Sequence, residues 1–395
     1  EENNNSNLNP TNNNSTNNNS NNTQNLNSNE REKFIELQSK YIKLKKLLIE
    51  ENITNLELFD GQNIVKASPM MLIEKNAEVF KITTEEGRSH SITPYHKVLT
   101  DKGLVECKDL KIGTRVSIQR KEGMFGNVHM PEMAFLLGLY HGDGTQTNDK
   151  VFIDVWENDF KLKNEIESCI QFVYSANNWL EYSVESKFGS TFTRKTKVPS
   201  FFNQQTGTSE VKKNRLGSAK LKQFGFQKEI IPEWVWSGDK ETQSQYIRGL
   251  FITDGCVRVS DSKKSFGNPL YLSLTSISFS LLQNVQIILS NMGINSKIYK
   301  FRDECETYLP NGKGSSSLYK CKEAWRLNIN DKNSALKFEK LTGFLSYKGV
   351  NLENRVYRDN TKKFDTIKSI EKIENQDVYC TTVDSKEHVW TCNSF

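Results

Sequence analysis

One segment of this sequence occurs twice, and the duplication limits the possible folds more than any other feature. The first copy reads Met133-Ala-Phe-Leu-Leu-Gly-Leu-Tyr-His-Gly-Asp-Gly144, and the second reads Gln245-Tyr-Ile-Arg-Gly-Leu-Phe-Ile-Thr-Asp-Gly255. Similar features follow both copies in the same order: a β-rich stretch, a helical stretch, an Arg-Leu pair and a helical stretch that ends in Gly-Phe. This order predicts two structural halves related by a pseudo-two-fold axis.

Each copy has the pattern of a helix that packs closely against another helix. Gly138 and Gly142 are four residues apart and share one helix face, and Gly249 and Thr253 repeat this spacing. Small residues at that spacing allow two backbones to approach each other. We expect the glycine after each aspartate to end its helix in a left-handed conformation.

Asp143 and Asp254 are the last polar residues of the two predicted helices. Two carboxylates at converging C-terminal helix ends repel each other and the helix dipoles, and a divalent cation would relieve this. Mg²⁺ binds few carboxylates together with water and phosphate oxygens, and a metal-activated water hydrolyses phosphodiesters. One such helix end alone would be an ordinary Asp-Gly turn. Two matched ends predict a metal-dependent nuclease that uses Mg²⁺ or another divalent cation.

The two copies resemble the nine-residue motif of the LAGLIDADG homing endonucleases. Leu136–Gly144 and Ile247–Gly255 align with it without gaps, and the segment Lys228-Glu-Ile-Ile-Pro-Glu-Trp234 resembles the family's approach to its second motif. His141 stands where the motif has an acidic residue, and Arg248 stands where it has a small one. The resemblance covers about residues 123–360.

This resemblance implies a monomer with two αββαββα halves whose curved sheets line the major groove of a long, asymmetric DNA site. It assigns the metal to Asp143 and Asp254, and it suggests Lys213 or Lys322 as a supporting lysine. Basic side chains in predicted hairpins would reach the phosphates, although a solvated face explains them equally well. They are Arg194, Lys195, Lys197, Lys263 and Lys264.

The segments on either side of this block read as β-strands, with short β-branched stretches separated by glycine turns such as Glu86-Gly87. Thr93-Pro-Tyr-His96 resembles the T-x-x-H block of intein (Hint) domains. Asp377-Val-Tyr-Cys-Thr-Thr-Val383 with Glu387-His388 resembles a block near the end of that domain. The resemblance implies a split all-β Hint (horseshoe) domain interrupted by the endonuclease, and therefore an α+β protein.

Protein splicing explains the residue types in these blocks. Rearranging a peptide bond needs a proton donor at the amide nitrogen, and histidine titrates near neutral pH. By resemblance, His96 would polarise the upstream junction amide with the help of Thr93, and His388 would assist the downstream cleavage. Cys380 would shuttle protons or act as a nucleophile, or it would be a small buried strand residue. No cofactor is expected for splicing.

Residue 1 is Glu, and the chain stops at Asn393-Ser-Phe395. We therefore expect both splice junctions to be missing, either because the chain is a fragment of a longer precursor or because it is an endonuclease with a decayed Hint domain. The expected divisions are an Asn-rich disordered linker at 1–29, an amphipathic helix at 30–55, Hint parts at 56–122 and 363–395, and the endonuclease at 123–362 with halves 123–230 and 231–362.

Composition agrees with this interpretation. The net charge is +5, which suits a nucleic-acid partner, and the seven cysteines contain no C-x-x-C pair. We expect an intracellular location set by the host protein, no membrane contact, and as partners double-stranded DNA of the intein-less host gene and the host exteins. Two alternatives stay open: a DNA-binding module without nuclease activity, and a splicing element with an inactive nuclease.

Overall fold

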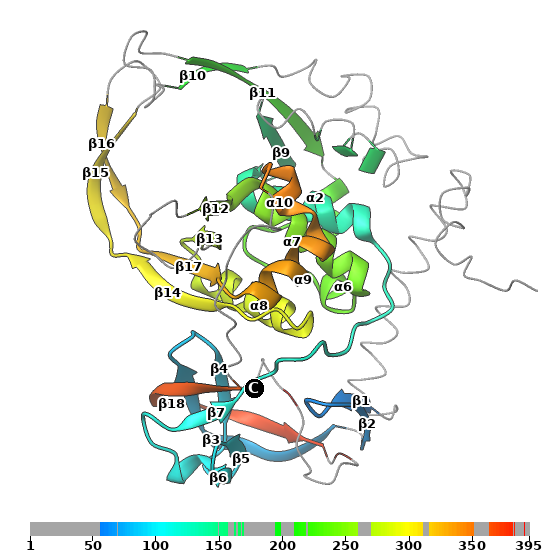
Figure 1. The fold of residues 1–395 in the computed structure, drawn as a ribbon, viewed down its shortest axis with the longest axis vertical. Coiled ribbons are helices and arrows are strands. Elements are labelled where there is room, and N and C mark those ends of the chain that lie inside the picture. Colours follow the sequence, from blue (N-terminus) through cyan, green and yellow to red (C-terminus); the bar gives the residue numbers. More distant parts are fainter. Residues whose placement is uncertain are drawn as a thin grey trace, which may run out of the picture.

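The computed structural model combines a module of β-strands with a module of helices and sheets (Figure 1). We call the described residues of 56–118 with 363–391 the β module, and those of 128–350 the repeat module. The structure describes 56–68, 70–148, 150–156, 194–198, 209–218, 220–259, 270–310, 316–350 and 363–381, and positions 162, 165, 166, 168, 169, 383 and 391. The predicted Asn-rich tract and amphipathic helix, Lys263, Lys264 and His388 lie outside these residues.

One six-stranded sheet in the β module is built from both sides of the repeat module. Its strand order is β4-β3-β18-β7-β5-β6, so β18 pairs with β3 and β7 although the repeat module lies between them in sequence. Ile82, Val116 and Ile367 are buried in its core. The strands are β3 (Met71–Thr84), β4 (Ser89–Ile92), β5 (Lys97–Thr100), β6 (Gly103–Glu106), β7 (Arg115–Ser117) and β18 (Phe364–Cys380), with a 3₁₀ turn at Cys107–Asp109.

A short hairpin of β1 (Leu56–Phe59) and β2 (Ile64–Ala67) completes the β module. Ala67 bridges to Val383, and the amide of Thr391 donates to the carbonyl of Phe59 at 2.8 Å. The hairpin therefore holds the last described positions of the chain. The turns expected at Gly87, Gly103 and Gly113 are present, and all three glycines have positive φ.

Helices α2 (Pro131–Asp143) and α7 (Lys240–Asp254) lie together at the centre of the repeat module (Figure 1). Ten of the 13 residues of α2 are buried, so this helix is enclosed almost all round. The surrounding helices are α5 (Lys220–Gln223), α6 (Glu233–Trp236), α8 (Phe279–Asn291), α9 (Lys332–Thr342) and α10 (Phe344–Tyr347).

Two four-stranded sheets with matching strand order flank these helices. The first sheet runs β10-β11-β9-β8 and the second runs β14-β17-β13-β12, so strands that follow each helix occupy equivalent places. This agreement supports the predicted duplication. The strands are β8 (Thr145–Gln146), β9 (Val151–Trp156), β10 (Arg194–Val198), β11 (Ser209–Ser218), β12 (Gly255–Val259), β13 (Leu270–Ser276), β14 (Lys297–Arg302) and β17 (Ala324–Ile329).

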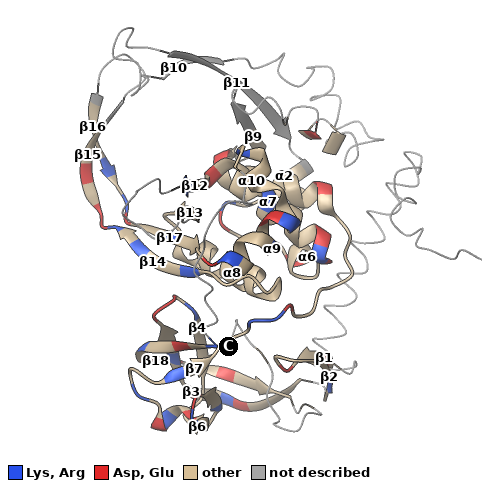
Figure 2. Cartoon of the chain, in the orientation of Figure 1, with Lys and Arg blue, Asp and Glu red and all other residues tan. Residues whose placement is uncertain are grey.

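The second half follows the predicted αββαββα order, with one addition. A hairpin of β15 (Cys305–Pro310) and β16 (Ser316–Cys321) extends between β14 and β17. Figure 1 shows β10–β11 and β14–β16 as two curved arms that leave the helical centre. The basic residues of β14 are Lys297, Lys300 and Arg302, β16 has Lys320, and the acidic residue of β15 is Glu306 (Figure 2).

Candidate functional site

The contact between α2 and α7 is a contact between backbones. A Cβ added to Gly138 would lie 2.9 Å from the Cα of Gly249, and one added to Gly249 would lie 3.1 Å from the Cα of Gly138. The first distance is shorter than real Cβ contacts, and a Cβ on Gly249 would also collide with the carbonyl oxygen of Phe135, so both positions require glycine. The prediction of close approach from small residues is therefore confirmed. The contact brings the ends of the two helices, and with them Asp143 and Asp254, to the same region.

The conformation predicted for Gly144 and Gly255 is wrong. Both have extended backbones, with φ of −72° and −75°, and neither is left-handed. Each amide instead closes the last turn by donating to the carbonyl of Tyr140 or Phe251. A Cβ on either glycine would collide with that same turn. Both positions therefore need glycine because a Cβ would not fit against the last helical turn. Strand β8 begins just after Gly144, and strand β12 begins at Gly255.

The pKa of Asp254 is raised by desolvation and by the charge of Asp143. Asp254 is exposed and Asp143 is half-buried. The surrounding protein still removes enough water from the Asp254 carboxylate to raise its pKa to about 6, and the negative charge of Asp143 adds to this rise. The Lys228 ammonium opposes it. The two carboxylates are thus close enough to disfavour joint ionisation, as expected of a pair that a cation would stabilise.

Lys228 caps the C-terminal end of α2, a role that the sequence did not predict. Its Nζ donates to the carbonyls of Tyr140, His141 and Gly142 at 2.7, 2.9 and 2.9 Å. A cation satisfying the last carbonyls of a helix is stabilised by the helix dipole. The sequence feature that could have indicated this role is the position of Lys228. It lies two residues after Gly225-Phe226, at the start of the segment that leads to the second motif.

The second half has a related but looser contact. Lys348 follows Gly343-Phe344 and donates to the carbonyl of Ile252, in the last turn of α7, at 3.4 Å. The two predicted supporting lysines lie elsewhere. Lys322 is exposed between β16 and β17, and the side chain of Lys213 on β11 lies outside what the structure describes. Those two assignments stay predictions.

The two residues that depart from the motif both make specific contacts. Arg248 forms a two-pronged ion pair with Glu165. His141 is buried, and burial lowers its pKa to about 4, so the imidazole is neutral. It lies 2.9 Å from the hydroxyl of Tyr246 on α7 and 2.9 Å from the carbonyl of Gln227. Neither residue carries charge into the region of the aspartates.

One face of the second sheet is polar and the other is buried. On β17, Leu327 and Ile329 face the core, while Arg326 and Asn328 point to the opposite face. Arg326 donates from Nε to the Thr275 hydroxyl at 3.0 Å, and its guanidinium lies 3.4 Å from the ring centroid of Phe301. A planar cation held in this way is suited to hydrogen bonding in a DNA groove.

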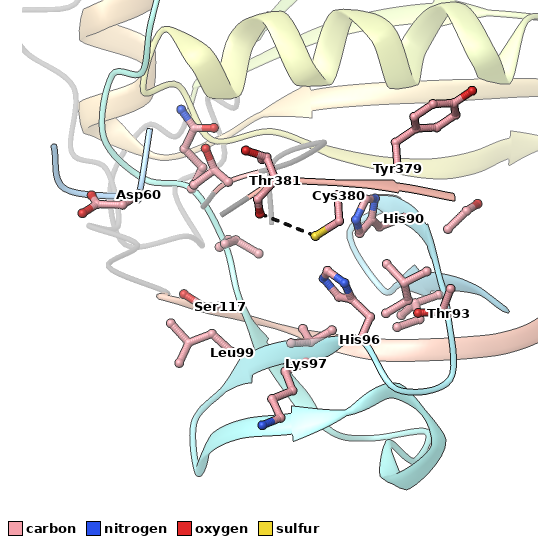
Figure 3. A pocket seen from close by; sticks show the side chains of 18 of the residues that line it. Asp60, His90, Thr93, His96, Lys97, Leu99, Ser117, Tyr379, Cys380 and Thr381 are labelled. Atoms are coloured by element: carbon pink, nitrogen blue, oxygen red, sulfur yellow. Dashed lines mark hydrogen bonds between the residues drawn. The ribbon is translucent and has the colours of Figure 1, made fainter. Parts of the chain in front are cut away.

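A second candidate site lies in a pocket of the β module (Figure 3). Thr93, His96 and Cys380 all line it, so the structure brings together the three described residues that the sequence proposed for splicing. Thr93 and His96 belong to one turn, in which the amide of His96 donates to the carbonyl of Thr93 at 3.1 Å. Cys380 ends β18, and its Sγ lies 3.5 Å from the carbonyl of Thr381.

His90 joins this pocket without having been predicted. Its ring and that of His96 meet edge to face, with centroids 6.3 Å apart. Burial lowers the pKa of His90 to about 4, with the nearby His96 adding to the effect, and burial also lowers the pKa of His96. Both imidazoles are therefore neutral at pH 7, a state in which His96 can donate one hydrogen bond, accept another and take up a proton. A histidine three residues before the T-x-x-H turn was the available signal.

Comparison with known proteins gives a domain match in the second half. Residues 241–343, from α7 to the end of α9, match the LAGLIDADG-like domain. The chain is 30% identical over 375 residues to the ribonucleoside-diphosphate reductase NrdEB subunit alpha of Bacillus subtilis, which covers 90% of this chain and 33% of that protein. It is 24% identical over 221 residues to the replicative DNA helicase DnaB of Rhodothermus marinus, covering 56% of this chain and 22% of that one. The chain thus spans at most about a third of these two relatives.

Two solved structures each match part of the chain. Variants of the homing endonuclease I-DmoI match 54% of this chain and 90% of their own, at 15% identity and a TM-score of 0.29. A variant of the Ssp DnaB mini-intein matches 21% of this chain and 52% of its own, at 20% identity and a TM-score of 0.17. Because both TM-scores are below 0.5, the fold described above rests on this chain's own strands and helices.

A cluster of metal-binding side chains and a membrane-spanning helix are both absent from the described residues. These residues contain no group of three or more His, Cys, Asp and Glu side chains arranged to hold a metal ion. A cation at Asp143 and Asp254 would therefore depend on water and phosphate oxygens for its other ligands, which Mg²⁺ accepts. None of the described helices has the length and apolar character needed to cross a membrane.

Proposed function

We propose that the repeat module is a metal-dependent, site-specific DNA endonuclease that cuts both strands of a long, asymmetric site. The observation that carries this proposal is the pair Asp143 and Asp254 at the converging ends of α2 and α7, where the charge of one raises the pKa of the other. One chain supplies both halves, so it acts as a monomer. Mg²⁺ or another divalent cation bound there would supply an activated water and stabilise the leaving oxygen.

The remaining residues position DNA and balance charge. Lys228 places a positive charge beside the carboxylate pair, where it would face a scissile phosphate. The polar face with Arg326 and Asn328 would read base edges, while basic residues on β10 and β14 would contact phosphates. The match of residues 241–343 to a LAGLIDADG-like domain supports this proposal. We propose as target the host gene without the insertion.

Asp143→Asn and Asp254→Asn are each expected to reduce DNA cleavage more than about 100-fold. Losing a group that only orients a metal ligand reduces activity by about 10- to 100-fold, and losing the ligand itself should reduce it further. The measurement is cutting of a plasmid with the empty host-gene site, in Mg²⁺, by the full chain. Wild type should give one double-strand break. Equal cutting by all three proteins, or binding without cleavage by wild type in every divalent metal, would overturn the proposal and favour a DNA-binding module.

A melting measurement on Asp254→Asn distinguishes a loss of cleavage from a loss of folding. Because the folded-state pKa of Asp254 is raised from 3.8 to about 6, ionisation destabilises the folded protein. The penalty is absent below the unfolded value and complete above the folded one. The variant should therefore melt higher than wild type at pH 8, with a smaller difference at pH 5. Mg²⁺ should raise the melting temperature of wild type only.

We infer a second function for the β module, autocatalytic protein splicing in a complete precursor. The pocket that gathers Thr93, His96 and Cys380 favours it, together with the sheet that joins residues 71–117 to residues 364–380. Neutral His96 would take the proton of the attacking upstream nucleophile and then pass it, as the imidazolium, to the nitrogen of the junction amide. Cys380 would act at the downstream step with His388. The partners are the flanking host segments, and no cofactor is needed.

His96→Ala is expected to slow splicing by about 10²- to 10⁴-fold, the range for losing a general acid. The complete precursor between two reporter proteins provides the measurement, because ligated reporter appears only after splicing. Asp143→Asn in the same precursor is the matched control and should splice normally. Ligation at the wild-type rate in His96→Ala would contradict the assignment. Splicing by a precursor that never cuts DNA would indicate an inactive nuclease.

A further inference from the structure

The lysine at the end of α2 is carried by a constrained turn. Residues 227–230 form it, with a bridge between Gln227 and Ile230. Glu229 has φ of +67°, a left-handed conformation that a side chain other than glycine rarely adopts. Such strain persists only where the surrounding structure holds it. Lys228 lies inside this turn, so whatever fixes the turn also fixes the ammonium.

His141 is the side chain that holds the turn to the helices. Its Nε2 lies 2.9 Å from the carbonyl of Gln227, which can only accept, so Nε2 carries the proton. Nδ1 then accepts from the hydroxyl of Tyr246 at 2.9 Å. The imidazole thus connects α2, α7 and the residue before Lys228. The imidazole is 5% exposed, its hydrogen bond with Tyr246 is buried, and its hydrogen bond with Gln227 is partly buried.

We propose that His141 is a positioning residue, which holds Lys228 against the end of α2 and beside the aspartate pair by anchoring the carbonyl of Gln227. This inference rests on the proposed nuclease function. It assigns a role to the histidine that departs from the repeated motif: α7 has Ile252 at the equivalent position, and its lysine contact, from Lys348, is the longer one at 3.4 Å. His141 itself touches no substrate.

The first test measures the position of Lys228 and needs no DNA cleavage. Acylation of the full chain with an N-hydroxysuccinimide ester, followed by mass spectrometry, reports how often the ammonium leaves its three carbonyls. His141→Leu should raise the labelling rate of Lys228 about tenfold through easier local opening, while exposed Lys102 serves as the internal standard. His141→Gln, which can donate to Gln227 and accept from Tyr246, should restore protection. Unchanged labelling in His141→Leu would overturn the proposal.

The second test asks whether His141 acts through Lys228. In single-turnover cleavage His141→Leu should lose about 10- to 100-fold in rate, with DNA affinity nearly unchanged, as for other residues that orient a reacting group. In a Lys228→Met background the same change should have little further effect. Equal losses in both backgrounds would mean a purely structural role. A wild type that does not cut would overturn the proposed function, while the labelling result would still decide the position of Lys228.

Discussion

Arg88→Met is expected to destabilise the folded protein by about 3–5 kcal/mol, because it leaves buried charges without their partner. The guanidinium is fully buried in the turn between β3 and β4. It donates to Glu86 at 2.8 Å and to Asp365 of β18 at 3.2 Å. Its other amino group reaches the repeat module, donating to the side chain of Asn295 at 2.8 Å and to the carbonyl of Ser296 at 3.3 Å.

The turn that carries Arg88 is also held through its backbone. The carbonyl of Glu86 accepts from the amide of Ile298 at 2.9 Å and from the side chain of Gln286 at 3.0 Å. Both donors belong to the second half of the repeat module. The guanidinium is therefore the charged centre of the junction between the modules. Its loss should weaken the junction and the adjoining strand β4, which carries His90 into the pocket lined by His96 and Cys380.

Arg115→Met provides the matched control for this prediction. That arginine is 56% exposed and 3.4 Å from Asp101, an exposed pair worth about 0–1 kcal/mol. Urea unfolding of both variants measures the difference. Neutralising the carboxylates as well, in a Glu86→Gln, Arg88→Met, Asp365→Asn triple variant, should recover part of the loss. Equal unfolding midpoints for the two single variants would contradict the burial of Arg88 as a source of stability.

The features that could be predicted from sequence are those with local signals. The repeated motif marked α2 and α7, glycine spacing marked their contact, and turn residues such as Gly87 marked strand ends. The sequence predicts two separate strands at 366–373 and 378–383, whereas most of these residues lie in one long strand, β18, because pairing with β3 continues through bulges. Strand pairing is decided by a partner distant in sequence, so the stretch alone could not reveal it.

The candidate sites were predictable to the extent that their residues belong to motifs. Asp143, Asp254, Thr93 and His96 were found in this way. Lys228, His141 and Arg88 were assigned no such role, because their partners lie far along the chain: Arg88 meets Asn295 and Asp365 at separations of 207 and 277 residues. A Glu-Glu-Gly-Arg turn looks solvent-exposed in isolation, and only the docking of a second module buries it.

Gly138→Ala is expected to destabilise the protein by about 3 kcal/mol, the upper end of ordinary overpacking, and to reduce DNA cleavage about 100-fold. The added methyl would meet backbone atoms of Tyr246, Leu250 and Gly249 on α7. Backbone cannot rotate away, so the two helices must separate. Their ends carry Asp143 and Asp254, and a shift of about 1 Å at reacting groups is enough for the loss of rate. Thermal melting and cleavage assays measure both effects.

Gly142→Ala is the matched control, because it adds the same methyl one turn further along the same helix face. The three atoms nearest to that methyl all belong to the side chain of Thr253. Thr253→Gly should therefore restore cleavage to Gly142→Ala, whereas no side-chain change on α7 can restore it to Gly138→Ala. Rescue of one glycine variant but not the other would show that contact between the backbones sets the separation of the two carboxylates. Full activity in Gly138→Ala would mean that the aspartates act without a fixed separation, and a two-carboxylate metal site could not tolerate that.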